Sequence, residues 1–154
     1  MPEQIKPNFP TLIPELPAWN NGAGIDAEDW ISCVGNFELA VGYSLVFWPS
    51  FVLFDGYVLR EGFLESSLRG FENATGRDRR SVEAVMNHIH IADLHADGTT
   101  ATEAQLRYLG RVLKDIYEVK LKRDFPRLQF TVVFNDEDGL DLTDYQLTFW
   151  QSVD

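Results

Sequence analysis

The sequence predicts an α+β fold: one domain in which a small, mostly antiparallel sheet packs against three helices, preceded by a proline-rich extended arm. Three observations support this prediction. Prolines are concentrated at the start of the chain, short apolar segments flank turn residues near the middle and at the end, and helical repeats of apolar residues lie between them. With 154 residues, the chain is long enough to bury a substantial core.

Residues 1–24 are expected to form the arm, and residues 25–154 the single domain. Five of the seven prolines fall within the first seventeen residues. Each proline fixes its own φ angle and pushes the preceding residue toward extended geometry, so neither a helix nor a central strand is expected here. Apolar residues between Phe9 and Trp19 suggest that the arm docks on the surface of the domain.

A short helix and a meander of two or three strands are expected next. Asp26 can cap the helix, with acidic residues in its first turn. From Phe37 to Phe47, large apolar residues alternate with smaller or polar ones, which is the period of a half-buried strand. A helical spacing is also present, but two glycines and the β-branched residues weaken it. After Pro49, the dipeptide Asp55-Gly56 between two apolar segments predicts a tight hairpin.

The three helices of the domain are expected between the meander and the end of the chain. The first covers Glu61–Ala74, and the second is expected to reach at least His90 because its apolar repeat continues that far. Two overlapping capping boxes place the start of the third helix at Thr100 or Thr102. This helix should end before Pro126.

The last part of the chain is expected to form a hairpin from residues 127–134 and 145–151. Both segments carry apolar residues on both faces, so both faces should be covered. The cover can be helices, the arm or another chain. A homodimer formed through this C-terminal hairpin is therefore one possibility.

The charge of the chain restricts its partners. The formal net charge is −11 and the sequence pI is near 4.6. Residues 1–59 contain one cation and seven anions, and residues 128–154 contain six anions and no cation. Duplex nucleic acid and anionic membranes both require a basic surface, so neither is expected as a partner. A basic protein is the expected partner.

The cellular compartment is expected to be the cytoplasm. The chain begins without the basic region and continuous apolar segment of a secretory signal. Cys33 is the only cysteine, so no intramolecular disulfide can form, and we expect its thiol to be buried. An uncharged stretch from Leu39 to Phe54 is shorter than the roughly 20 residues of a spanning helix, so no membrane association is expected.

All three histidines lie in one short stretch that could bind a metal. In an extended segment, His88 and His90 project from the same face, and Asp93 or His95 could supply further ligands, for which zinc is the best suited ion. In a helix, His88 and His90 would point about 200° apart. Because the helix is expected to include His90, a metal-dependent enzyme, a hydrolase, is the alternative interpretation and not the leading one.

The leading interpretation is a non-enzymatic, acidic protein-binding module, because no catalytic signature is apparent in the chain. Its size and charge resemble those of small inhibitors of the immunity or antitoxin type, an analogy based on composition alone. The candidate partner-binding residues combine an aromatic region with the acidic loop of the C-terminal hairpin. They are Trp48, Tyr57, Asp136, Glu137 and Asp138.

Overall fold

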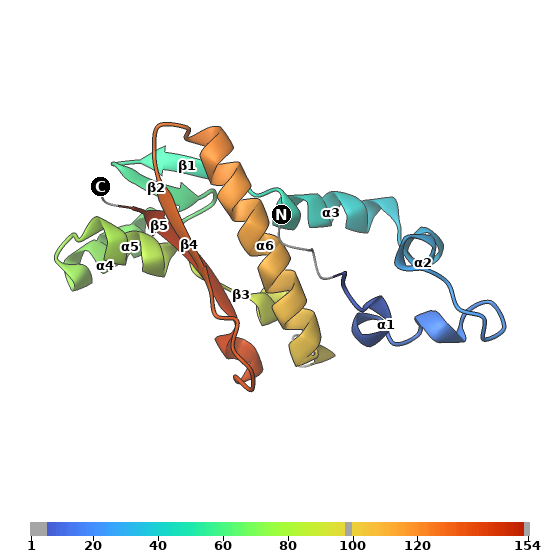
Figure 1. Ribbon diagram of the computed structural model, residues 1–154. Coiled ribbons are helices and arrows are strands. Elements are labelled where there is room, and N and C mark those ends of the chain that lie inside the picture. The colour runs from blue at the N-terminus through green and yellow to red at the C-terminus, as the bar shows by residue number, and fades with distance from the viewer. Residues whose placement is uncertain (1–5, 98–99, 153–154) are drawn as a thin grey trace. The chain divides into compact units, whose positions relative to one another are not determined.

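A computed structural model describes residues 6–97 and 100–152 (Figure 1). The chain divides into two compact units, one before and one after the bond between Tyr43 and Ser44. Helices occur together with two small antiparallel sheets, so the α+β class is confirmed. Among the residues described, no helix is both long enough and apolar enough to cross a membrane.

The first unit contains short helical segments where an extended arm was expected. Helix α1 covers Phe9–Leu12, and the 3-10 helix η1 covers Leu16–Ala18. The expectation that this region has no helix was wrong because its prolines lie in the first turns, where a backbone N–H has no helical partner to lose. Helix α2, Ala27–Val34, begins as predicted: Asp26 accepts a hydrogen bond from the Asp29 N–H at 2.8 Å.

Residues Phe37–Phe47 form helix α3, so the prediction of a strand here was wrong. The side chain of Asn36 accepts a hydrogen bond from the Leu39 N–H at 2.9 Å, which satisfies one of the free donors of the first turn. Eight of the eleven residues in this segment are hydrophobic, so its alternation does not distinguish a strand from a helix.

In the second unit, the first sheet is the predicted hairpin. Strand β1, Phe51–Phe54, pairs with β2, Tyr57–Arg60. The turn residues Asp55 and Gly56 have φ angles of 51° and 83°. Positive φ at both central positions is the geometry of a type I′ turn, which an Asp-Gly pair favours.

Two helices follow the hairpin. Helix α4 covers Glu65–Thr75 and ends at Gly76, whose φ of 66° lies in the left-handed region. Helix α5 covers Arg79–Met86, and its cap is Asp78, which accepts a hydrogen bond from the Ser81 N–H at 3.0 Å. The first of these helices was predicted with an earlier start.

The second sheet contains three antiparallel strands in the order β3-β5-β4. It is separate from the two-stranded sheet of β1 and β2. Strand β3 is Ile89–His90, β4 is Phe130–Phe134 and β5 is Gln146–Gln151. Between β3 and β4 lie the 3-10 helix η2, Ile91–Leu94, and the long helix α6, Glu103–Asp124. The capping box between Thr102 and Gln105 forms as predicted.

Helices cover both faces of the central strand β5. On one face, the ring centroid of Phe149 lies 6.0 Å from the ring centroid of Tyr117 in α6. On the other face, the hydroxyl of Thr148 donates to the Ala84 carbonyl in α5 at 2.6 Å. Figure 1 shows α6 (orange) and helices α4 and α5 (green) on opposite sides of strands β4 and β5. The prediction that both faces of this hairpin are covered is therefore confirmed for β5.

Candidate functional site

Helix α5 ends at Met86, so the expectation that it extends to His90 was wrong. The side chain of Asn87 is fully buried and bonds to backbone groups of β2 and β5. The next residues then pair with β5 as strand β3, with His90 opposite Gln146. These tertiary hydrogen bonds outweigh the helical spacing of the apolar residues.

The end of the helix brings two of the predicted histidines together. The ring centroids of His88 and His90 lie 5.2 Å apart, at an interplanar angle of 84°. Each Nδ1 lies 2.6 Å from a backbone carbonyl, that of Val85 for His88 and that of Thr143 for His90. Because a carbonyl can only accept, each Nδ1 must carry a hydrogen, and the Nε2 atoms are the nitrogens left for other partners.

The other two predicted metal ligands do not complete a metal site in the described residues. Asp93 lies in η2, and His95 follows that helix directly. Over residues 6–97 and 100–152, no three His, Cys, Asp or Glu side chains are grouped so that they could hold an ion. The structure thus pairs His88 with His90 but does not gather Asp93 and His95 around them.

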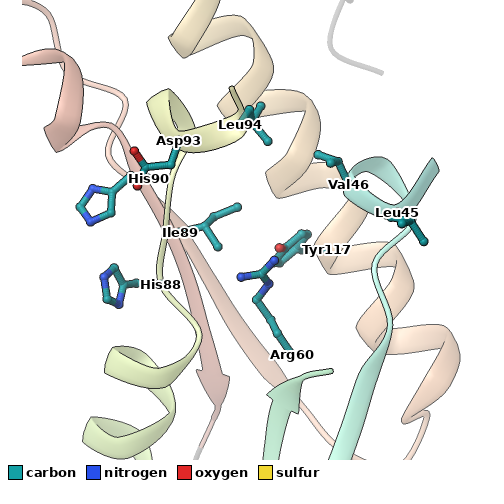
Figure 2. Close-up of a pocket in the computed structure, with 9 residues that line it drawn as sticks. All are labelled: Leu45, Val46, Arg60, His88, Ile89, His90, Asp93, Leu94 and Tyr117. Atoms are coloured by element: carbon teal, nitrogen blue, oxygen red, sulfur yellow. The ribbon is translucent and has the colours of Figure 1, made fainter. Parts of the chain in front are cut away.

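A cavity of about 490 Å³ lies beside strand β3 in the second unit. Figure 2 shows Ile89 pointing to one side of this strand, and the rings of His88 and His90 pointing to the other. The apolar part of the cavity lining comes from Leu45, Val46, Ile89 and Leu94. The volume falls in the range typical of small-molecule sites, which is roughly 300–1,000 Å³.

The polar part of the cavity lining comes from Arg60, Tyr117, His88, His90 and Asp93, of which Arg60 and Tyr117 lie close together. Figure 2 shows the guanidinium of Arg60 next to the oxygen of Tyr117, on the Ile89 side of β3. Burial raises the pKa of the Tyr117 hydroxyl, and the positive charge of Arg60 opposes that rise. The Nε atom of Arg60 is buried, and among the described residues it has no hydrogen-bond partner.

Arg60 also has no ion pair with any carboxylate in the described part of the chain. Sequence reasoning missed both cavity residues. A signal for Arg60 existed, since it is the first Lys or Arg after Lys6 and ends an otherwise apolar strand. Tyr117 lies in the middle of helix α6, and no local motif marks it as a site residue.

The candidate partner-binding residues do not form one surface. The Trp48 side chain is 45% exposed, and the cations of Lys120 and Arg123 lie 5.3 and 5.4 Å from its ring centroid. Asp136, at the other end of α6, accepts a hydrogen bond from Arg107 Nε at 2.8 Å. Residues 107 and 120 of one helix are roughly 20 Å apart, because an α-helix rises 1.5 Å per residue.

Two of the three candidate acids in the acidic loop, Asp136 and Asp138, are paired with arginines of the same chain. Asp136 also accepts a hydrogen bond from Arg111 Nε at 2.6 Å, and Asp138 pairs with Arg107. The hydrogen bond from Arg111, with a further contribution from Arg107, lowers the pKa of Asp136. Of the three candidate acids in this loop, Glu137 is the one for which no ion pair with a described residue is found.

Tyr57 is not available to a partner in this structure. Its side chain is 6% exposed, and its hydroxyl donates a hydrogen bond to Glu72 Oε2 at 2.8 Å. Its aromatic ring packs the hairpin against helix α4, in a cluster with Leu68.

Helix α3 instead exposes a continuous apolar stripe. Phe37, Val41 and Leu45 recur at i,i+4 spacing, which places them on one side of the helix, and they are 91%, 67% and 75% exposed. All eleven residues of α3 are described, and none is buried. Cys33, just before this helix, is also exposed, contrary to the expectation of a buried thiol.

No protein-family model, curated protein or solved structure matches the chain.

Proposed function

We propose that the chain is a non-enzymatic binding protein and that helix α3 is its contact surface for a basic protein partner. The observation that carries this proposal is the exposed stripe of Phe37, Val41 and Leu45. Removing apolar surface from water contributes roughly 25 cal/mol per Å². A partner that covers this stripe would gain that contribution, and apolar patches of this kind are typical of interaction sites.

The charge around α3 favours a basic partner. Residues 7–59 contain six acidic side chains and no Lys or Arg. Glu38 lies on α3, and Glu28 and Asp29 lie in the first turn of the preceding helix. An apolar centre with a charged rim is the usual composition of a protein interface, and a negative rim attracts a positive surface.

The contacts of the original candidate residues support this choice of surface. Asp136 and Asp138 are already paired with Arg107, so a basic partner would have to compete with that arginine. Trp48 lies beneath two cations of the same chain. Helix α3 contains no Lys or Arg that a basic partner would have to displace, since Glu38 is its only charged residue.

The proposal is tested by capturing partners from a lysate of the native host with tagged protein, at low and high salt. The double variant F37S/V41S removes the centre of the stripe, and L64S is the matched control because Leu64 is 66% exposed outside α3. A basic protein should be retained by wild type and L64S, be lost with the double variant and be released by salt. Retention of the same proteins by all three variants would contradict the proposal.

Self-association is the competing explanation for an exposed apolar surface. A second copy could cover α3, or it could pair with β4, which is an edge strand of its sheet. Sedimentation equilibrium distinguishes these cases from binding of a foreign partner. A monomer supports the proposal; a dimer that F37S/V41S dissociates makes the second copy the occupant of α3; and a dimer unaffected by that variant supports the hairpin interface.

The second candidate function is that of a metal-dependent enzyme, and the pairing of His88 with His90 favours it. Two neutral imidazoles on one face are a common part of a zinc site, although a catalytic site needs at least one further protein ligand. Metal analysis of protein purified without a polyhistidine tag tests this candidate. Close to one equivalent of zinc would support it, and less than about one-tenth of an equivalent would exclude a site that survives purification.

A further inference from the structure

We propose that the cavity beside strand β3 binds a small organic acid, with one carboxylate group and an apolar tail. The proposal rests on a cation that lines a cavity with apolar walls: the buried Nε–H of Arg60 has no acceptor, and Arg60 has no ion pair with a carboxylate among the described residues. Leu45 and Val46 at the end of helix α3 contribute to the cavity lining, but the proposal does not depend on the proposed function, because it is argued from Arg60 and Tyr117.

The state of Arg60 indicates that a partner is missing. The Arg60 side chain is partly buried, and its guanidinium is hydrogen-bonded to the Tyr117 side chain, but its buried Nε–H has no acceptor among the described residues. A buried donor without an acceptor is unfavourable, and most buried polar groups in proteins have a hydrogen-bond partner. Its Nε–H is one of five donors on a planar group, arranged so that a carboxylate can accept two hydrogen bonds side by side. A ligand carboxylate in the cavity would supply the acceptor that the chain does not.

Tyr117 offers a second contact to the same group. Its side chain is 1% exposed, and its oxygen lies next to the Arg60 guanidinium in Figure 2. A phenol hydroxyl can donate to a carboxylate oxygen, so the pair resembles the few polar groups that orient a ligand in a mostly apolar site.

The other residues of the cavity lining favour an anion with a single negative charge and an apolar tail. Leu45, Val46, Ile89 and Leu94 provide apolar walls that a hydrocarbon or aromatic tail can contact. Arg60 is the only Lys or Arg in the lining, and Asp93 adds a negative charge to it. A phosphate carries more charge and favours several cations, so a monocarboxylate fits this cavity better.

The test compares three probes by calorimetric titration and by ¹H–¹⁵N spectra that include the arginine Nε–H resonances. Octanoate has both the charge and the tail, octanamide has the tail without the charge, and inorganic phosphate has charge without a tail. We expect octanoate to bind and to shift the Arg60 Nε–H resonance, with binding at least about tenfold weaker for each of the other probes. Equal binding of octanamide, stronger binding of phosphate, or no binding of octanoate would overturn the proposal.

Variants locate the site. R60Q should weaken octanoate binding about tenfold or more, and Y117F should weaken it several-fold. R127Q removes the same charge at an exposed position outside the cavity and should bind octanoate like wild type. Unchanged binding by R60Q, or an equal loss in R127Q, would contradict the assignment.

The stability of R60Q gives an independent readout. If Arg60 is an unpaired charge held for a ligand, its replacement should leave the melting temperature of the ligand-free protein unchanged or raise it. A clear decrease would mean that Arg60 has a structural partner and would contradict the proposal. The comparison of octanoate with octanamide on the wild-type protein decides the question even if R60Q fails to fold.

Discussion

The side-chain amide of Asn87 donates a hydrogen bond to the Val58 carbonyl at 2.9 Å, which ties the end of helix α5 to strand β2. The same amide lies 3.4 Å from the Phe149 carbonyl of β5, and its oxygen accepts from the Arg60 N–H at 3.1 Å. One buried side chain therefore joins strands of the two sheets. It also ends the helix just before His88.

Replacing Asn87 with alanine should destabilise the protein. The change leaves two buried carbonyls and one partly buried backbone N–H without this partner, and each unsatisfied buried group costs roughly 1–3 kcal/mol. We expect the free energy of unfolding to fall by about 2–4 kcal/mol in urea denaturation. N73A, at an exposed position of α4, is the matched control and should change it by less than about 0.5 kcal/mol. Equal effects of the two variants would contradict a central role for Asn87.

Gly110 and Gly70 should respond to alanine with opposite signs. A Cβ added at Gly110 would lie 2.1 Å from Cζ of Phe134, whereas nothing lies within 4 Å of one added at Gly70. G110A should lower the free energy of unfolding by about 1–3 kcal/mol, because the buried ring must move. G70A should raise it by roughly 0.5–1 kcal/mol, since alanine favours a helix more than glycine does. Urea unfolding of both variants checks this. Stabilisation by G110A would contradict the prediction, because it would show that the Phe134 ring can move without lowering the free energy of unfolding.

The sequence predicted the elements that have a local signal. The Asp55-Gly56 turn and the caps formed by Asp26 and Thr102 all appear as expected, because each depends on residues within a few positions. Helix α3 was mistaken for a strand because its apolar residues satisfy both periods. The decisive signal, the Asn36 side chain at its start, is also local and was available in the sequence.

The candidate site was harder to predict because tertiary contacts decide it. The pairing of His88 with His90 depends on where α5 ends, which Asn87 sets through strands distant in sequence. Arg60 and Tyr117 meet across 57 residues of sequence, and no short motif marks such a pair. The charge of the acidic loop was visible in the sequence, but its neutralisation by Arg107 was not.

The stability that Glu72 contributes to the folded protein should be lost in acid. Its pKa is lowered from the ordinary value of 4.5, mainly by the hydrogen bond from Arg69 and then by that from Tyr57. A lowered folded-state pKa means that its contribution is fully present above pH 4.5 and is lost as the pH falls through the folded pKa. E72Q should therefore be destabilising at pH 7, and its difference from wild type should shrink below pH 4.5. Urea unfolding across this range checks the trend, and a difference that stays constant with pH would contradict it.

The contribution of Glu83 to the stability of the fold should depend on pH in the opposite direction. Its side chain is fully buried, where it accepts hydrogen bonds from the Val58 N–H at 3.2 Å and from Gln151 Nε2 at 3.2 Å. Burial raises its pKa above 4.5 despite these donors, so its contribution to stability is present below pH 4.5 and is lost as the pH rises through the folded pKa.

The variant E83Q separates this effect from the loss of hydrogen bonds. Glutamine replaces one acceptor oxygen with a donor, so E83Q should be less stable than wild type at low pH, where the wild-type carboxyl is neutral. As the pH rises through the folded pKa of Glu83, wild type loses stability that E83Q cannot lose, and the difference between them should narrow. Unfolding free energies of both proteins measured from acidic to neutral pH check this. A difference that widens with rising pH would show that the donors around Glu83 outweigh its burial and lower its pKa instead.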